Sequence, residues 1–134
     1  MSRSCNESGD RQQSGFKILA VDDDAVSLFI LKKILVYYGH SVTCVSSGFA
    51  CFEKLSCTKY DIVLMDIAMP EINGIDTLTR IREYGHTIPV IATTAHALKT
   101  EQEHILKSGF DGYISKPYDY YMMNVLIRET IQGV

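Results

Sequence analysis

Residues 61–76 read DIVLMDIAMPEINGID, and this stretch decides the fold. Within it, residues 62–65 are apolar at every position rather than at every second one. That pattern is typical of a strand buried on both faces of a parallel sheet. Asp66 follows the apolar run directly, and a helical pattern over 75–83 comes after a short loop. The stretch therefore predicts one strand–loop–helix unit of an α/β protein.

The same rhythm recurs along the chain on both sides of this unit. Short apolar runs, expected to be strands, occupy residues 17–21, 41–45, 62–65, 90–94 and 112–115. Helical patterns follow them at 25–38, 49–55, 75–83, 100–107 and 120–132. Strands that alternate with helices predict an α/β fold class with one doubly wound parallel sheet of five strands and five helices.

Apolar spacing indicates which helix positions form amphipathic faces. The pattern at 25–38 has apolar residues three and four positions apart, namely Val26, Phe29, Ile30, Ile34 and Tyr37. The pattern at 49–55 leaves two faces open, one with Phe49, Phe52 and Leu55 and one with Cys51 and Leu55. In the last helix Asp119 is the expected N-cap, and the inward residues are Met123, Leu126, Ile127 and Ile131.

Length and composition narrow the possible classes. A chain of 134 residues, 46% hydrophobic and 22% charged, predicts a single domain with its own core. We expect a disordered polar tail over 1–15 and one domain over 16–134. The net charge of −3 argues against nucleic-acid binding, and no apolar run is long enough to span a membrane. The four cysteines are best interpreted as free thiols, mostly buried, which suits a reducing, cytoplasmic location, with a nuclear one left open.

Polar residues gather where the predicted strands end. Asp22, Asp23 and Asp24 follow the first strand, Thr94 ends the fourth, and Lys116 follows the fifth. Ligands of doubly wound sheets bind beyond the carboxyl ends of the strands, so these side chains are expected to meet Asp66 there. No charged residue directly follows the 41–45 run, which suits a strand at the edge of the sheet.

Such a cluster has a definite chemistry. Neighbouring carboxylates raise one another's pKa or bind a cation, and hard oxygen ligands suit Mg²⁺. A lysine can hold a phosphoryl oxygen, and an ionised aspartate is a nucleophile. Each residue alone has an ordinary structural interpretation, and Asp24 is best interpreted as a helix N-cap. Their coincidence at successive strand ends predicts phosphoryl transfer onto a carboxylate.

Four stretches, ILAVDDD, DIVLMDIAMPEINGID, PVIATTA and GFDGYISKP, make the chain resemble the receiver domain of two-component response regulators. The resemblance runs from residue 17 to about residue 131. It implies a flavodoxin-like fold with strand order 2-1-3-4-5 and a cis peptide between Lys116 and Pro117. The implied roles are phosphoacceptor for Asp66, Mg²⁺ ligands for Asp22, Asp23, Asp66 and the backbone carbonyl of Ala68, and phosphoryl binding and switching for Thr94, Lys116 and Tyr113.

The resemblance also implies which proteins act as partners and which residues control the rate of dephosphorylation. The phosphoryl donor would be a sensor histidine kinase or a histidine phosphotransfer domain. Output would pass through the face formed by the fourth helix, fifth strand and fifth helix, which borders Tyr118, Tyr120 and Tyr121. Ala68 and His96 flank the path of attacking water and would tune dephosphorylation. Ala68 cannot orient water, so we expect slow decay, whereas His96 is either a catalytic base or an exposed loop residue.

Several alternatives compete with a signalling switch or relay intermediate. An aspartyl-phosphate phosphatase would place a second aspartate two residues after the nucleophile, where this chain has Ala68, so turnover as an enzyme is not expected. A flavodoxin-like electron carrier is disfavoured because Asp22, Asp23 and Asp24 would repel a flavin phosphate. A degenerate receiver used only for binding is disfavoured because Asp23, Asp66, Thr94 and Lys116 are all present. A phosphate carrier without conformational output stays open. The Met1 start favours a complete chain, although a fragment is the other option.

Overall fold

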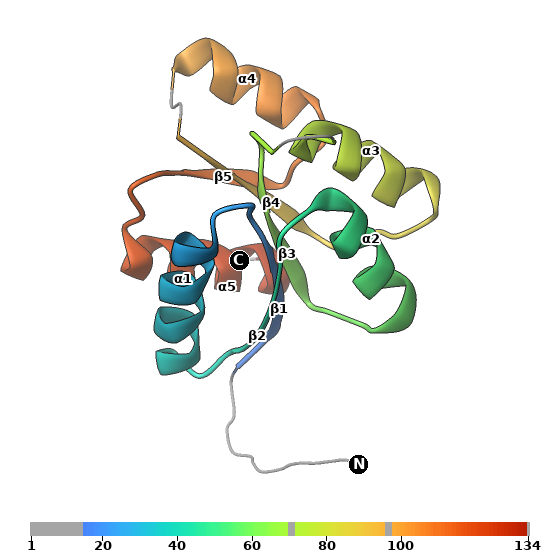
Figure 1. Cartoon of the computed structure of the whole chain (residues 1–134). Coiled ribbons are helices and arrows are strands. Elements are labelled where there is room, and N and C mark those ends of the chain that lie inside the picture. Colours follow the sequence, from blue (N-terminus) through green and yellow to red (C-terminus); the bar gives the residue numbers. More distant parts are fainter. Residues whose placement is uncertain (1–14, 70–71, 96–97, 134) are drawn as a thin grey trace.

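The structure is a computed structural model that describes residues 15–69, 72–95 and 98–133. Across these ranges five parallel strands form one sheet in the order β2-β1-β3-β4-β5 (Figure 1). The strands are β1 (Lys17–Val21), β2 (Ser41–Val45), β3 (Ile62–Asp66), β4 (Val90–Thr94) and β5 (Gly112–Ser115). The helices are α1 (Ala25–Tyr37), α2 (Gly48–Cys57), α3 (Gly74–Glu83), α4 (Lys99–Lys107) and α5 (Tyr120–Gln132). The tail predicted over 1–15 lies outside the described residues except for Gly15.

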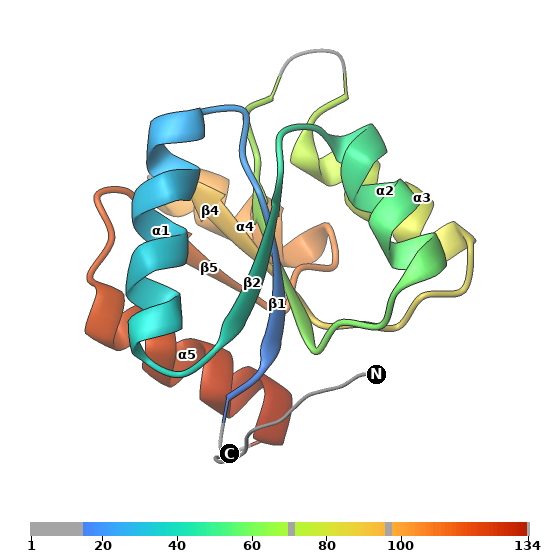
Figure 2. The same cartoon turned by 60° about the horizontal axis from the view of Figure 1, so that its bottom comes forward.

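The sheet is sandwiched between two layers of helices. Helices α1 and α5 lie on one side, and α2, α3 and α4 lie on the other (Figures 1 and 2). Ile18 and Ala20 of β1 pack toward α1 and α5, while Leu19 and Val21 pack toward the opposite layer. Because successive strand residues point to opposite faces, a strand covered on both sides needs apolar residues at every position. The five predicted strands are confirmed, and coverage of the sheet on both faces explains why their sequences are apolar at consecutive positions.

The sheet order brings the carboxyl ends of four strands together. Strand β2 lies at one edge, as its uncharged end predicted. Asp66 of β3 lies opposite Thr93 of β4, and Thr94 lies opposite Ser115 of β5. Residues that follow β1, β3, β4 and β5 therefore converge on one end of the sheet.

Element boundaries differ from the predicted ones by up to two residues. Strand β3 includes Asp66, which the sequence placed just after the strand. Helix α2 begins earlier because the Ser47 side chain accepts a hydrogen bond from the Ala50 N–H, which caps the helix. On α2 the buried side chains include Cys51 and Leu55, so the second of its two predicted faces is the packed one.

The apolar pattern predicted for the first helix does not mark its packed face. Four of its residues are largely exposed, Val26 at 66%, Phe29 at 63%, Ile30 at 43% and Tyr37 at 86%. The buried side of α1 carries three leucines instead. This helix is apolar around most of its circumference, so periodicity alone fits two opposite faces. The leucines that cover the sheet are Leu28, Leu31 and Leu35, and we call Val26, Phe29, Ile30 and Tyr37 the α1 stripe.

Candidate functional site

Three aspartates meet at the carboxyl edge of the sheet. Asp22 and Asp23 follow β1, and Asp66 is the last residue of β3. One carboxylate oxygen from each lies within 4.8 Å of the others, a grouping that arises once among the described residues. Asp22 and Asp66 are buried, whereas Asp23 faces solvent. The prediction that these three residues come together is confirmed.

Asp24 has the structural role expected of it. Its carboxylate accepts hydrogen bonds from the Val26 N–H at 3.1 Å and from the Ser27 hydroxyl at 2.9 Å. Its own N–H donates to Asp22 Oδ1 at 2.9 Å. Asp24 therefore caps α1 and helps to hold Asp22 in place rather than joining the carboxylate group.

Lys116 faces the carboxylates from the loop after β5. Its ammonium Nζ donates to Asp22 Oδ2 at 2.9 Å and lies 3.8 Å from Asp66 Oδ1. The Lys116 N–H donates to the Thr94 carbonyl at 2.8 Å, which ties this loop to the end of β4. The Lys116–Pro117 peptide is cis, as the resemblance implied.

The remaining predicted site residues occupy different positions. Thr94 is buried at the end of β4. Tyr113 lies on β5 opposite Ala92 and packs on the core beneath α2, α3 and α4. Ala68 lies exposed two residues past Asp66. His96 lies outside the described residues, so its predicted role is untested.

Burial sets the electrostatics of the cluster. Desolvation raises the pKa of Asp66 from its ordinary value of 3.8 to about 6, and the nearby Asp22 charge acts in the same direction while Lys116 opposes both. Burial by itself would lower the pKa of Lys116, but its hydrogen bond to Asp22 and the surrounding negative groups leave that pKa raised. The site therefore accumulates more negative charge than Lys116 alone can balance.

This raised pKa predicts a pH-dependent stability without metal. Asp66 holds its proton more tightly in the folded state, so its contribution to stability is present below pH 4 and is lost as the pH rises through about 6. Relative to the Asp66→Asn variant, the wild-type protein should lose on the order of 2 kcal/mol of unfolding free energy between pH 4 and pH 7. Urea unfolding of both proteins in EDTA measures this difference. Parallel stability curves for the two proteins would contradict it.

The fold and this geometry define a class of protein. The parallel sheet of this α/β fold brings three aspartates and Lys116 together where its strands end. This arrangement suits a phosphoacceptor domain. Residues 18–128 match the family model of the response regulator receiver domain, so the chain belongs to that family. Receiver domains are the phosphoacceptor units of two-component and phosphorelay signalling, and this is the functional class of the chain.

Individual relatives are similar over most of this chain. Over 75% of its own length, this chain is 33% identical to the sensor histidine kinase GacS of Pseudomonas protegens. Over 79% of its own length, it is 35% identical to the transcription factor SKN7 of Saccharomyces cerevisiae. These alignments cover 12% and 17% of those proteins, so the chain spans less than a fifth of either relative.

Solved receiver domains have the same architecture. The receiver domain of the Francisella response regulator 1452 superimposes with a TM-score of 0.84 at 25% identity, covering 89% of this chain and 98% of that one. The receiver domain of the sensor histidine kinase PA1611 from Pseudomonas aeruginosa gives 0.81 at 29% identity, covering 89% and 99%. That second structure has a magnesium ion coordinated in its active-site cleft. Among the described residues of this chain, no helix is both long and apolar enough to cross a membrane.

Two features of the site region escaped the sequence analysis. The apolar spacing identified the residues of the α1 stripe, but it predicted them to be the packed face of the helix, whereas they are exposed. Thr93 is 2% exposed and lies directly opposite Asp66, but only the second member of the Thr93-Thr94 pair had been considered. A polar residue inside a fully buried strand was the signal that could have drawn attention to it.

Proposed function

We propose that Asp66 accepts a phosphoryl group from a phosphohistidine in a Mg²⁺-dependent reaction. The observation that carries this proposal is the meeting of three carboxylates within 4.8 Å with Lys116 beside Asp66. To test it, the protein is incubated with a phosphohistidine protein or with acetyl phosphate, and its intact mass is measured to detect the added phosphoryl group. The assignment of residues 16–134 as the working domain is part of the same proposal.

The residues present suit a magnesium ion. Asp22, Asp23 and Asp66 would hold it, and the Ala68 carbonyl is our fourth proposed ligand. All are hard oxygen donors, and the repulsion that raises the pKa of Asp66 would be relieved by a cation. When bound, the ion would neutralise negative charge on the transferred group.

The chain's own side chains would carry the transfer. A carboxylate oxygen of Asp66 attacks phosphorus, the O–P bond forms as the N–P bond to the imidazole breaks, and the imidazole nitrogen leaves with the bonding pair. We assign Lys116 and the Thr94 hydroxyl to the phosphoryl oxygens, because Lys116 Nζ lies 3.8 Å from Asp66 and Thr94 ends β4, the strand next to β3 in the sheet. Lys116 would then exchange part of its contact with Asp22 for contact with the phosphoryl group.

We propose a switch or relay intermediate rather than a turnover enzyme. Ala68 occupies the position where a phosphatase of this chemistry would have its general acid, and its methyl group cannot orient water. Slow decay of phospho-Asp66 follows from the same feature, with His96 as the second proposed determinant. A cytoplasmic or nuclear location is also proposed, on the basis of the free cysteines among the described residues, namely Cys44, Cys51 and Cys57.

The α1 stripe supports the proposed phosphohistidine donor, a sensor histidine kinase or a histidine phosphotransfer domain. Exposed apolar patches of this kind often mark interaction sites. Ile30 of the stripe also lines a hollow of about 230 Å³ with Lys116, Pro117 and Tyr118. A donor domain resting on the stripe would therefore reach the edge of the site that holds Lys116.

Phe29→Ala should separate docking from chemistry. We expect transfer from a phosphohistidine protein to slow at least about 10-fold, as for a buried interface aromatic, while labelling by acetyl phosphate stays within about 2-fold of wild type. Initial rates with both donors measure this. Tyr84→Ala removes a comparably exposed aromatic residue at the end of α3, in the opposite helix layer, and serves as the control. Equal slowing by both substitutions, or with both donors, would refute the stripe as a docking surface.

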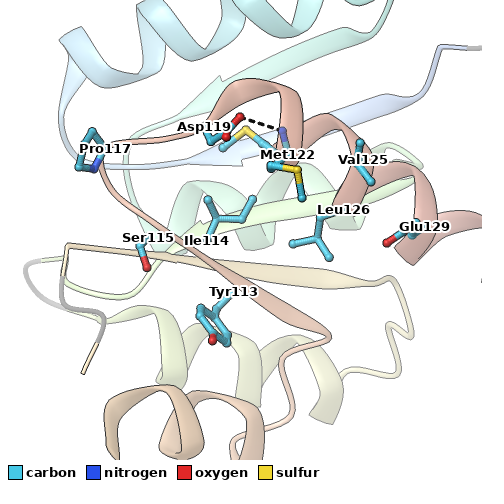
Figure 3. Close-up of a pocket in the computed structure, with 10 residues that line it drawn as sticks. Tyr113, Ile114, Ser115, Pro117, Asp119, Met122, Val125, Leu126 and Glu129 are labelled. Carbon is cyan, nitrogen blue, oxygen red and sulfur yellow. Dashed lines mark hydrogen bonds between the residues drawn. The ribbon is translucent and has the colours of Figure 1, made fainter. Parts of the chain in front are cut away.

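Output is proposed through the face of α4, β5 and α5. Drawing Thr94 toward the phosphoryl group would open space into which Tyr113 moves. Figure 3 shows Tyr113 and Ile114 extending from opposite sides of β5, beside a cavity of about 360 Å³ that Met122 and Leu126 of α5 also line. Tyr118 and Tyr120 lie nearer to α1, and Tyr121 is exposed on α5.

The Thr94→Ala variant tests the output proposal. It should still accept phosphate, but a partner that binds the phosphorylated form about 10-fold more tightly should lose that preference to within about 2-fold. In the wild-type protein, amide shifts on phosphorylation should reach Tyr113 and α4. If the wild-type shifts stay confined to the loops around Asp66, the chain is a phosphate carrier without conformational output.

A further inference from the structure

Helix α3 begins directly against the backbone of the proposed phosphoacceptor. Its first residue, Gly74, is buried, and the Gly74 N–H donates to the Ile67 carbonyl at 3.0 Å. A methyl group on Gly74 would overlap the Asp66 carbonyl oxygen and lie 3.0 Å from the Ile67 Cα. Both are backbone atoms, so no change of rotamer could relieve the overlap. Only glycine therefore lets the helix start this close to Asp66.

The backbone beneath Gly74 leads into the site. The Ile67 N–H donates to the Thr93 carbonyl of β4 at 3.1 Å, while the Ile67 carbonyl accepts from Gly74. Ile67 is thus held by β4 on one side and by α3 on the other. Its two neighbours in the chain are Asp66, the proposed phosphoacceptor, and Ala68, whose carbonyl is a proposed Mg²⁺ ligand. The position of this short segment therefore sets the positions of both oxygen donors.

A second glycine contact holds the start of α3 from the side of α2. A methyl group on Gly48, the first residue of α2, would overlap Thr77 Oγ1 and lie 3.1 Å from Ile72 Cγ2. Thr77 is 1% exposed, and its hydroxyl donates to the Asn73 carbonyl at 2.8 Å. Helices α2 and α3 lie side by side (Figures 1 and 2). The start of α3 is therefore fitted between α2 and the Asp66 backbone, with a glycine in each contact.

We propose that Gly74 is a positioning residue, which holds the Asp66 carboxylate and the Ala68 carbonyl in place for Mg²⁺ binding and phosphoryl transfer. Gly48 supports this arrangement from α2. The inference rests on the proposed phosphoacceptor role of Asp66. Its physical basis is that a metal site works only when its ligands are held within about 0.5 Å of the productive geometry. Neither glycine contributes an atom to the site, so both act through the backbone that they allow to pack.

Gly74→Ala and Gly85→Ala form the first test. The methyl group in Gly74→Ala should push the Asp66 backbone by roughly 1 Å to reach ordinary contact. Labelling by acetyl phosphate should slow on the order of 100-fold, and affinity for Mg²⁺ alone should fall at least about 10-fold. Gly85 has a φ of +88° and nothing within 4 Å of an added methyl group. Gly85→Ala should therefore lower the urea midpoint of unfolding, while its labelling rate and Mg²⁺ affinity stay within about 2-fold of wild type.

A second pair of variants decides the matter even if Gly74→Ala does not fold. Gly48→Ala should slow labelling at least about fivefold, because its methyl group displaces Thr77 and with it the start of α3. Thr77→Ala removes the hydroxyl that this methyl group would overlap. The double variant Gly48→Ala/Thr77→Ala should therefore label within about 2-fold of Thr77→Ala alone.

Three results would overturn the inference. The first is a folded Gly74→Ala protein whose labelling rate and Mg²⁺ affinity are within 2-fold of wild type. The second is an equal loss in Gly85→Ala, which would show that reduced stability is the cause. The third is a Gly48→Ala defect that persists in full when Thr77→Ala is added. If the wild-type protein binds Mg²⁺ but takes up no phosphate, the phosphoacceptor proposal fails instead, and the Mg²⁺ affinities still test the positioning role.

Discussion

An Asp66→Asn protein should take up no phosphoryl group from acetyl phosphate and Mg²⁺, under conditions in which the wild-type protein takes up one. The amide lacks the anionic oxygen that would attack phosphorus, so the labelling rate should fall at least about 10³-fold. The asparagine side chain has nearly the same shape as the aspartate that it replaces, and its neutral amide reduces the excess of negative charge in the site. The variant should therefore remain folded. Intact mass after a fixed incubation measures the uptake.

The control for this experiment is Asp76→Asn, which removes an exposed carboxylate from the first turn of α3. Its labelling should match that of the wild-type protein. Labelling that Asp66→Asn retains at the wild-type level would show that another residue is the acceptor. Adventitious phosphate on serine or threonine is recognised by its resistance to hydroxylamine.

Asp23→Ala should abolish labelling at millimolar Mg²⁺ without unfolding the domain. Asp23 is the exposed member of the acidic trio, so its removal takes away one proposed ligand and disturbs little packing. The loss in labelling should exceed the roughly 10–100-fold loss typical of mutating a metal's outer shell. The unfolding free energy in EDTA should stay the same or rise, because one source of like-charge repulsion is gone.

Asp24→Ala is the matched control for Asp23→Ala. The neighbouring carboxylate caps α1, so its removal should cost about 1 kcal/mol of stability while labelling continues. The two adjacent aspartates should therefore have opposite phenotypes, one chemical and one structural. Full labelling of Asp23→Ala at the same Mg²⁺ concentration would argue against its role as a ligand.

Much of this architecture could be predicted because burial leaves a strong pattern. Strand β3 is covered on both faces, and its consecutive apolar residues record that directly. The convergence of Asp22, Asp66 and Lys116 followed from a topological rule, since parallel strands place their carboxyl ends at one edge. The strand order itself came from the resemblance to a family and not from periodicity.

Other features depend on choices that local pattern does not encode. The first helix is apolar on two opposite sides, and only packing against the sheet determines that Leu31 is buried and Phe29 exposed. Lys116 donates its hydrogen bond to Asp22 and lies farther from Asp66, and this choice depends on side-chain geometry across three strands. Thr93 escaped notice because a β-branched residue in a strand needs no special explanation until its hydroxyl proves to be buried.

The most direct test of the phosphoacceptor role is to map the phosphoryl group after transfer from a phosphohistidine protein. The unmodified chain would be incubated with such a donor, with and without Mg²⁺, and the hydroxylamine-sensitive site would be located by peptide mass. The account predicts one phosphoryl group, on Asp66, transferred only when Mg²⁺ is present. A label on any other residue, or transfer to Asp66 at the same rate in EDTA, would contradict it.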